Sequence, residues 1–183
     1  MKKLLLIIVF LVIIFSFFAI RDGSGTPQLQ NEETVSDGTF RPDPANATFT
    51  FDNRSITLSQ GRYETSIAPD SIFKEEIYTT DFTAYGDLNN DKKNDTAIIL
   101  VQASGASGVF IHLASYVSGP INYKGSNAVF LGDRVTPRTL KINNGIITVE
   151  YLDRKPDEPF AAEPTIPVTR HFEYKSGTLI EVN

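Results

Sequence analysis

The first strong pattern along the chain is a continuous apolar run near its N-terminus. Residues 4–20 read LLLIIVFLVIIFSFFAI, in which Ser16 is the one polar side chain, and Lys2 and Lys3 precede the run. Signal sequences have apolar cores of about 7–15 residues and spanning helices need about 17–25, so this run lies at the boundary between the two classes. We therefore predict one N-terminal transmembrane or signal helix, with residues 1–20 as a membrane anchor or signal segment.

The next stretch has the composition of a linker. Residues 21–46 read RDGSGTPQLQNEETVSDGTFRPDPAN and are rich in Gly, Ser, Thr, Pro, Asn and acidic residues. Such a segment cannot bury enough apolar surface to offset the entropy of ordering. We expect a flexible linker over residues 21–46, followed by an exported domain over residues 47–183.

From residue 47 the apolar positions follow the short period of β-strands. ATFTF at 47–51 alternates, and residues 72–85 are expected to form one strand or a bent pair. TAIILVQA at 96–103 is apolar without a break, which is typical of a strand buried on both faces. VFIHLASYV at 109–117 is its expected antiparallel partner.

Two hairpins are predicted near the C-terminus. Asn144-Gly145 stands between alternating apolar positions, and this dipeptide favours a turn in which both residues have positive φ. Ser176-Gly177 has the same setting, whereas residues 153–167 contain four prolines and are expected to form a surface loop. The predicted fold is mainly β, an antiparallel sheet or sandwich with hairpins.

Charge predicts which side of the membrane the domain occupies. Lys2 and Lys3 precede the apolar run, whereas Arg21-Asp22 after it is neutral, so the positive-inside rule exports residues 21–183. The exported part has 15 basic and 22 acidic residues, which argues against nucleic acid as a partner. We expect a single-pass protein of the cell membrane, held through residues 4–20 with its domain on the extracytoplasmic side. Cleavage within residues 1–25 would make it secreted or periplasmic.

One acidic loop carries candidate metal chemistry. The frame D-x-N-x-D-x-x-x-D places oxygen ligands at the spacing of a calcium loop, with a backbone carbonyl at its seventh position. The predicted calcium ligands are Asp87, Asn89, Asp91, Lys93 through its carbonyl, and Asp95. Lys92 replaces the usual glycine and Ile98 the usual final glutamate. The alternative is a turn whose Asp and Asn side chains cap their own backbone.

The remaining reactive residue types give no catalytic signature. His112 alternates with aromatic and small residues and is expected in a sheet face, whereas His171 is expected in solvent. Neither histidine has the spacing of a zinc site. Glu75 and Glu76 are adjacent, so in a strand they point to opposite sides and cannot act as a carboxylate pair.

Two resemblances follow from these motifs. GDLNNDKKNDTAIIL resembles the calcium-loop-then-strand unit GDLNGDG of FG-GAP and dockerin-type modules, from which it departs at Asn90 and Lys92, where the pattern has glycine. Over about residues 56–182 the chain resembles a set of uncharacterised bacterial cell-envelope proteins, which are often lipoproteins. The segments that carry this resemblance are, in order, ITLSQGRYE, AYGDLNNDKKNDTAIILV, GASGVFIHLASYV, FLGDRV, INNGIITVEYLDR and PTIPVTRHFEY. This resemblance implies an envelope location and no particular activity.

These patterns favour a membrane-tethered extracytoplasmic binding or structural domain, with calcium as a candidate stabilising ion and an envelope protein or glycan as partner. One alternative is a cell-wall or glycan hydrolase with two carboxylates distant in sequence, and another is a calcium-dependent adhesion module. A concave pocket with two carboxylates about 5–9.5 Å apart would favour the hydrolase.

Overall fold

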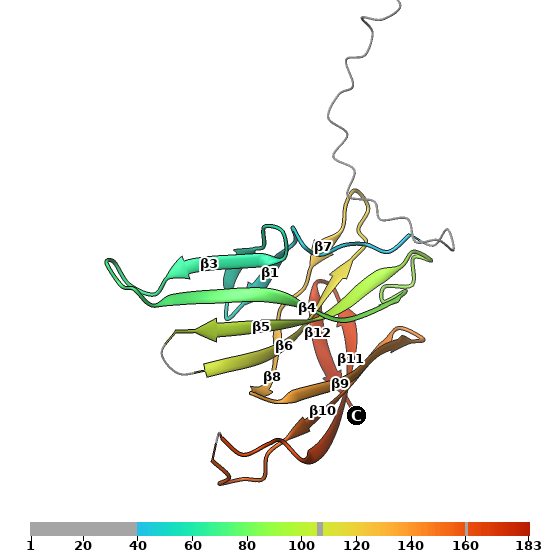
Figure 1. The fold of residues 1–183 in the computed structure, drawn as a ribbon. Coiled ribbons are helices and arrows are strands. Elements are labelled where there is room, and N and C mark those ends of the chain that lie inside the picture. The colour runs from blue at the N-terminus through green and yellow to red at the C-terminus, as the bar shows by residue number, and fades with distance from the viewer. Residues whose placement is uncertain (1–39, 106–107, 160) are drawn as a thin grey trace, which may run out of the picture. The chain divides into compact units, whose positions relative to one another are not determined.

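The computed structural model describes residues 40–105, 108–159 and 161–183 (Figure 1). The predicted helix over residues 4–20 and most of the predicted linker lie outside this part of the chain. The described residues contain strands, turns and loops, so the prediction of a mainly β, antiparallel fold is confirmed. Within these ranges, no helix has the length and apolar character needed to cross a membrane.

The strands of the described part, in chain order, are β1 (Thr48–Phe51), β2 (Arg54–Thr57), β3 (Arg62–Ser66), β4 (Lys74–Gly86), β5 (Asp95–Ser104), β6 (Gly108–Val117), β7 (Lys124–Gly125), β8 (Val129–Asp133), β9 (Thr136–Asn143), β10 (Ile146–Asp153), β11 (Ile166–Lys175) and β12 (Thr178–Val182). They form three sheets. The largest has the order β3-β4-β5-β6-β7 with β8 also paired to β6, the second has the order β12-β11-β10-β9, and β1 pairs with β2. Every pairing between these strands is antiparallel.

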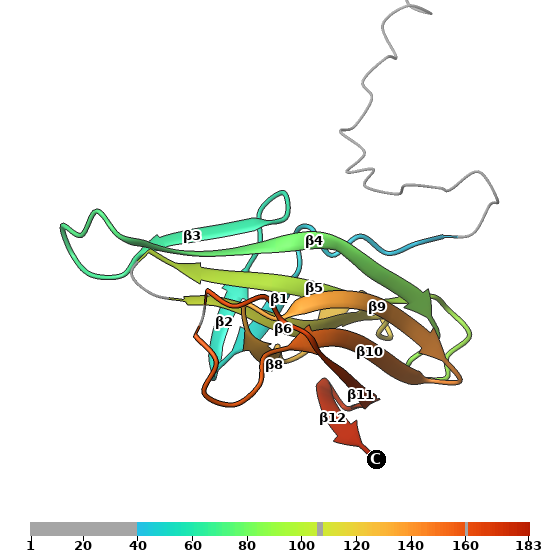
Figure 2. The ribbon, with the colours of Figure 1, turned by 60° about the horizontal axis from the view of Figure 1, so that its bottom comes forward.

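Strand β5 lies between two apolar cores. Ala97, Ile99 and Val101 face a core shared with the β9–β12 sheet, which crosses this face in Figure 2. Ile98 and Leu100 face the opposite core, which they share with the β1–β2 hairpin. Successive side chains of a strand point to opposite faces, so a strand covered on both sides must be apolar at every position. The prediction that this strand is buried on both faces is confirmed.

The two C-terminal hairpins also form as predicted. Asn144 and Gly145 have φ of 51° and 77°, and Ser176 and Gly177 have φ of 49° and 94°. Residues 154–165 connect β10 to β11 without a strand. Pro167 lies within β11 opposite Leu152. On the other side of β11, β12 pairs only from His171 onward. The missing N–H of Pro167 therefore does not remove a hydrogen bond to β12.

The domain begins earlier than residue 47, where the sequence placed its boundary. Thr96 Oγ1 donates a hydrogen bond of 2.6 Å to the carbonyl oxygen of Pro42. Asn94 Nδ2 donates to the carbonyl oxygen of Phe40 at 3.0 Å. Residues 40–46 therefore contact the β domain, although their polar, proline-containing composition is that of a linker.

Candidate functional site

The acidic loop between β4 and β5 caps its own backbone. Asp87 Oδ1 accepts hydrogen bonds from the backbone N–H groups of Asn90 at 2.6 Å and Asp91 at 3.2 Å. Asp87 Oδ2 accepts from the N–H of Lys92 at 2.8 Å. Asp91 Oδ1 accepts from the N–H of Lys93 at 2.9 Å. These bonds are the pattern expected of an Asp/Asn-rich turn.

Two loop residues adopt the backbone conformation that glycine would favour. Asn90 and Lys92 have φ of 67° and 68°, and they are the two positions at which the calcium-loop pattern has glycine. The left-handed region costs an ordinary L-residue about 1 kcal/mol or more. The loop thus keeps the backbone path of the pattern without its glycines.

Ser118, just after β6, anchors the loop to the sheet. Asp95 is fully buried, and its Oδ2 and Oδ1 accept hydrogen bonds from the N–H groups of Leu88 at 2.7 Å and Ser118 at 2.8 Å. Ser118 Oγ donates to Asp91 Oδ2, and Asn89 Nδ2 donates to the Ser118 carbonyl oxygen at 2.8 Å. Sequence reasoning had no signal for this role, because a serine after a strand is an ordinary loop residue.

The two acids that Ser118 contacts have opposite pKa shifts. Burial raises the pKa of Asp95, because removing a carboxylate from water disfavours its charged form. The hydrogen bond from the Ser118 hydroxyl lowers the pKa of Asp91, because it stabilises the ionised form. The charge on Asp91 is thus stabilised from within the protein.

This geometry fits a self-capped turn better than a calcium site. Ca²⁺ takes six to eight oxygen ligands around one point. No group of three or more His, Asp or Glu side chains within the described residues is arranged to hold a metal ion. Lys93 Nζ also lies 3.7 Å from Asp91 Oδ2 and supplies positive charge there. Calcium binding by Asp87, Asn89, Asp91, Lys93 and Asp95 stays a prediction that a titration can test.

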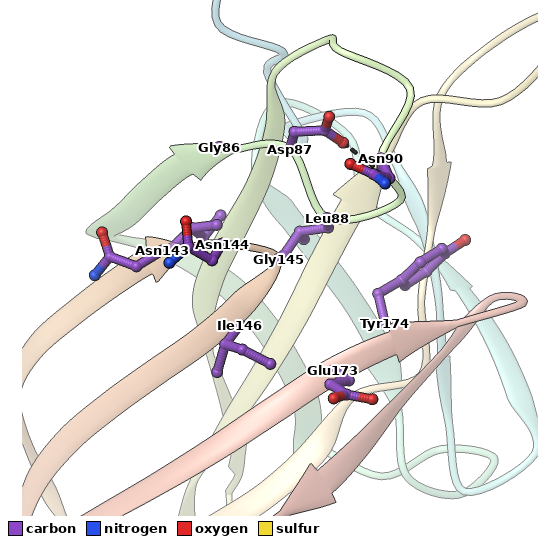
Figure 3. Close-up of a pocket in the computed structure, with 11 residues that line it drawn as sticks. Gly86, Asp87, Leu88, Asn90, Asn143, Asn144, Gly145, Ile146, Glu173 and Tyr174 are labelled. Carbon is purple, nitrogen blue, oxygen red and sulfur yellow. Dashed lines mark hydrogen bonds between the residues drawn. The ribbon is translucent and has the colours of Figure 1, made fainter.

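Beside the acidic loop lies a cavity of about 780 Å³, here called the loop–hairpin cavity (Figure 3). Three segments form its walls: the end of β4 with the acidic loop, the β9–β10 turn, and β11. The residues that line it are Gly86, Asp87, Leu88, Asn90, Ile142, Asn143, Asn144, Gly145, Ile146, Glu173 and Tyr174. Its volume lies within the range of about 300–1,000 Å³ that is usual for small-molecule sites.

Two glycines allow the loop and the hairpin to approach each other. A Cβ atom at Gly86 would lie 2.6 Å from Ile142 Cγ2, so only glycine lets β9 cross the end of β4 without displacement. Gly145 occupies the positive-φ position of the turn, and a Cβ there would lie 3.9 Å from the carbonyl oxygen of Asp87. The cavity therefore depends on the hairpin turn that the sequence predicted. Sequence reasoning missed the cavity because its walls come from segments distant in the chain.

The cavity has free amide groups at its walls. The side-chain amides of Asn90, Asn143 and Asn144 have no hydrogen-bond partner among the described residues. Each amide offers two N–H donors and one carbonyl acceptor. Figure 3 shows Asn143 and Asn144 on the hairpin turn and Asn90 on the loop above it. Asn90 and Asn144 remain available to a ligand, whereas the Asn143 side chain points away from the loop.

The two carboxylates of the cavity are already engaged. Asp87 accepts the three backbone N–H groups of its own loop, and Glu173 forms an ion pair of 2.6 Å with Lys175. Figure 3 shows them on opposite walls, with the Glu173 carboxylate directed away from Asp87. Hydrolysis by a carboxylate pair requires both acids to face the bond that breaks. This arrangement does not meet that condition.

The histidines lie outside the cavity. His112 is buried with 6% of its surface exposed, and its Nε2 lies 3.0 Å from Gln102 Oε1. Burial lowers its pKa to about 4. His171 is half-buried, with Nδ1 3.0 Å from Thr148 Oγ1, so it is less exposed than the sequence suggested. Both histidines therefore contact neighbouring side chains of the sheets and do not line the cavity.

Glu75 and Glu76 point to opposite sides of β4, as their adjacency predicts. Glu75 forms a two-pronged ion pair with Arg54, with distances of 2.7 and 2.9 Å. Glu76 pairs with Arg62 at 2.8 Å. The two acids therefore do not form a joint site.

Compared with protein-family models, curated proteins and solved structures, the chain has no match. The case for a function therefore rests on the chain's own residues.

Proposed function

We propose that this chain is a membrane-tethered extracytoplasmic binding domain and that the loop–hairpin cavity is its ligand site. One observation carries the proposal: a cavity of small-molecule size is lined by Asn90 and Asn144, whose side-chain amides have no partner among the described residues. Binding sites combine apolar walls with a few polar groups that orient the ligand, and this cavity has both.

Binding is better supported than hydrolysis for the same cavity. Asp87 and Glu173 give it the two carboxylates that a glycan hydrolase needs, which favours the hydrolase as the second candidate. However, Asp87 accepts the backbone N–H groups of its own loop, and Glu173 pairs with Lys175 and points away from Asp87 in Figure 3. A carboxylate pair that cleaves a glycan must face the same bond, so this orientation favours binding over hydrolysis.

The location rests on the N-terminal sequence. The apolar run over residues 4–20 after Lys2 and Lys3, and the acidic balance of the rest of the chain, support a tethered domain on the outer side of the membrane. The resemblance to bacterial envelope proteins points to the same compartment.

The absence of cysteine from the chain allows a clean test of location. Asn143→Cys places a single thiol on the exposed hairpin turn, and Asn53→Cys places one on the exposed β1–β2 turn. In intact cells, or in spheroplasts if an outer membrane is present, a membrane-impermeant maleimide should label both variants. Labelling only after lysis would place the domain in the cytoplasm and contradict the proposal.

The same two variants test the ligand site. An environment-sensitive fluorophore attached to the Asn143→Cys variant should respond to a soluble extract of cell-envelope glycans and proteins, because the ligand would displace water beside it. The same fluorophore on the Asn53→Cys variant is the matched control and should not respond. Equal responses from both variants, or none from the Asn143→Cys variant, would contradict binding in the cavity.

A further inference from the structure

The chemistry of the loop–hairpin cavity identifies a class of ligand. We infer that the cavity binds a neutral oligosaccharide, an inference that rests on the proposed binding function. It depends on three features of the walls: unpaired amides, an apolar surface with an aromatic ring, and the absence of a cationic residue from the described lining.

The amides match the hydroxyl groups of a sugar. A sugar hydroxyl both donates and accepts a hydrogen bond, and an asparagine amide presents donors and an acceptor side by side. Asn144 comes from the hairpin turn and Asn90 from the facing loop, so a ligand between them meets one amide from each side. Charged ligands gain most from charged partners, whereas amides favour a neutral polar ligand.

The apolar residues match the C–H surface of a sugar ring. Leu88, Ile142 and Tyr174 line the cavity from the side of the apolar core. Tyrosine combines a large apolar face with a polar edge, so it can contact a ring that is apolar on its face and polar at its rim. A small polar ion would leave this surface without a partner.

The lining gives an anion no cationic partner. Asp87 and Glu173 are its charged residues, and none of the described lining residues is Lys or Arg. An anionic glycan or a phosphate would therefore leave its charge without a partner in the cavity. Neutral chains, including N-acetylated ones, carry no such charge.

Isothermal titration of the full chain with oligosaccharide probes tests this inference. The protein is held in lauryldimethylamine oxide, a detergent without a sugar headgroup that could compete. The probes are tetramers of glucose, of N-acetylglucosamine and of galacturonic acid. We expect at least one neutral tetramer to bind and the galacturonic acid tetramer to bind at least about tenfold more weakly or not at all.

Matched variants locate the binding. Asn144→Gly and Asn90→Gly should each weaken the neutral tetramer about five- to tenfold, because each removes an amide that faces the ligand. Asn144 has φ of 51°, which glycine also adopts. Glycine at position 90 keeps the positive φ of the loop. Asn53→Gly is the control, since Asn53 also has positive φ, at 67°, is exposed and lies outside the cavity. It should leave the affinity unchanged.

Each alternative result would contradict a specific part of the proposal. If the galacturonic acid tetramer binds as tightly as the neutral ones, the neutral class is wrong but the cavity remains a binding site. If no tetramer binds while the fluorophore on the Asn143→Cys variant responds to envelope extract, the oligosaccharide inference fails and the proposed function stands. If neutral tetramers bind equally well to wild type and to both cavity variants, the site lies elsewhere and both fail.

Discussion

At the scale of single residues, His112 shows how a buried polar group limits the conditions under which the fold is stable. Gln102 Nε2 donates to Glu75 Oε1 at 2.7 Å, so its Oε1 faces His112 and requires a donor there. His112 Nε2 therefore holds the proton, and its buried Nδ1 is left as an acceptor with no partner among the described residues. Phe51 and Phe130 flank the ring edge-on, at 5.0 and 5.7 Å between ring centres. A second proton on this ring would have no acceptor there.

We predict that stability falls as the pH drops from about 6.5 to about 4. The folded pKa of His112, about 4, lies below that of the unfolded chain, so only the unfolded chain takes up a proton in this window. The negative charge of Asp52 raises the pKa of His112, but it offsets only part of the lowering caused by burial. The loss attributable to His112 is at most about 3 kcal/mol, complete near pH 4 and absent above about pH 7.

Urea unfolding of wild type and His112→Phe at a series of pH values measures this contribution. The variant should lose less stability than wild type between pH 7 and pH 4, because it has no group to protonate at this position. Parallel curves for the two proteins over that range would contradict the assigned tautomer and its burial.

At the scale of elements, one ion pair fastens the β1–β2 hairpin to the large sheet. Arg54 of β2 reaches Glu75 of β4, and the side chain of Glu75 is 11% exposed. Gln102 of β5 donates to the same carboxylate, and the hydrogen bond from Arg54 lowers the pKa of Glu75. Three strands thus meet at one largely buried carboxylate.

We predict that Glu75→Ala lowers the free energy of unfolding by about 2 kcal/mol, because it leaves the Gln102 amide without a partner in a part-buried position. Glu76→Ala is the matched control on the same strand. Its side chain is 31% exposed and pairs with Arg62, so its loss should cost no more than about 0.5 kcal/mol. Chemical denaturation of both variants checks this, and equal losses would contradict the role given to Glu75.

The acidic loop allows a direct choice between its two interpretations. A self-capped turn predicts no change in melting temperature between EDTA and about 5 mM Ca²⁺. The calcium site predicted from the sequence requires the melting temperature to rise by about 3–5 °C when the Ca²⁺ concentration is near ten times the dissociation constant. Asp91→Ala should abolish such a rise. The hydrogen bonds of Asp87, Asp91 and Asp95 lead us to expect no shift, and a rise that Asp91→Ala removes would contradict that.

The elements differ in how far the sequence predicts them, for physical reasons. The Asn144-Gly145 hairpin follows from local backbone preference, and β5 follows from burial that forces every position to be apolar. Strands β3 and β8 were not predicted, because exposed and half-buried residues dominate both and give no apolar stripe. Ser118 and the cavity depend on contacts between distant segments, which no local pattern records.

At the scale of the described domain, two cores on opposite faces of β5 set the position of the cavity. The β9–β12 sheet packs on one face through the core that contains Ile147, Val149 and Phe172. This packing brings the β9–β10 turn beside the acidic loop that leads into β5, at the site drawn in Figure 3. The packed sheets therefore position both walls of the cavity, and its polar side chains come largely from the loop and the turn.

The measurement that tests the central claim most directly is a map of backbone amide chemical shifts with and without a neutral oligosaccharide. If the loop–hairpin cavity is the binding site, the changes should be confined to residues 86–90, 142–146 and 173–174, and Asn144→Gly should weaken them. Changes centred elsewhere, for example on the exposed Ile72 and Phe73 before β4, would contradict the claim. So would the absence of any change at concentrations that saturate binding by calorimetry.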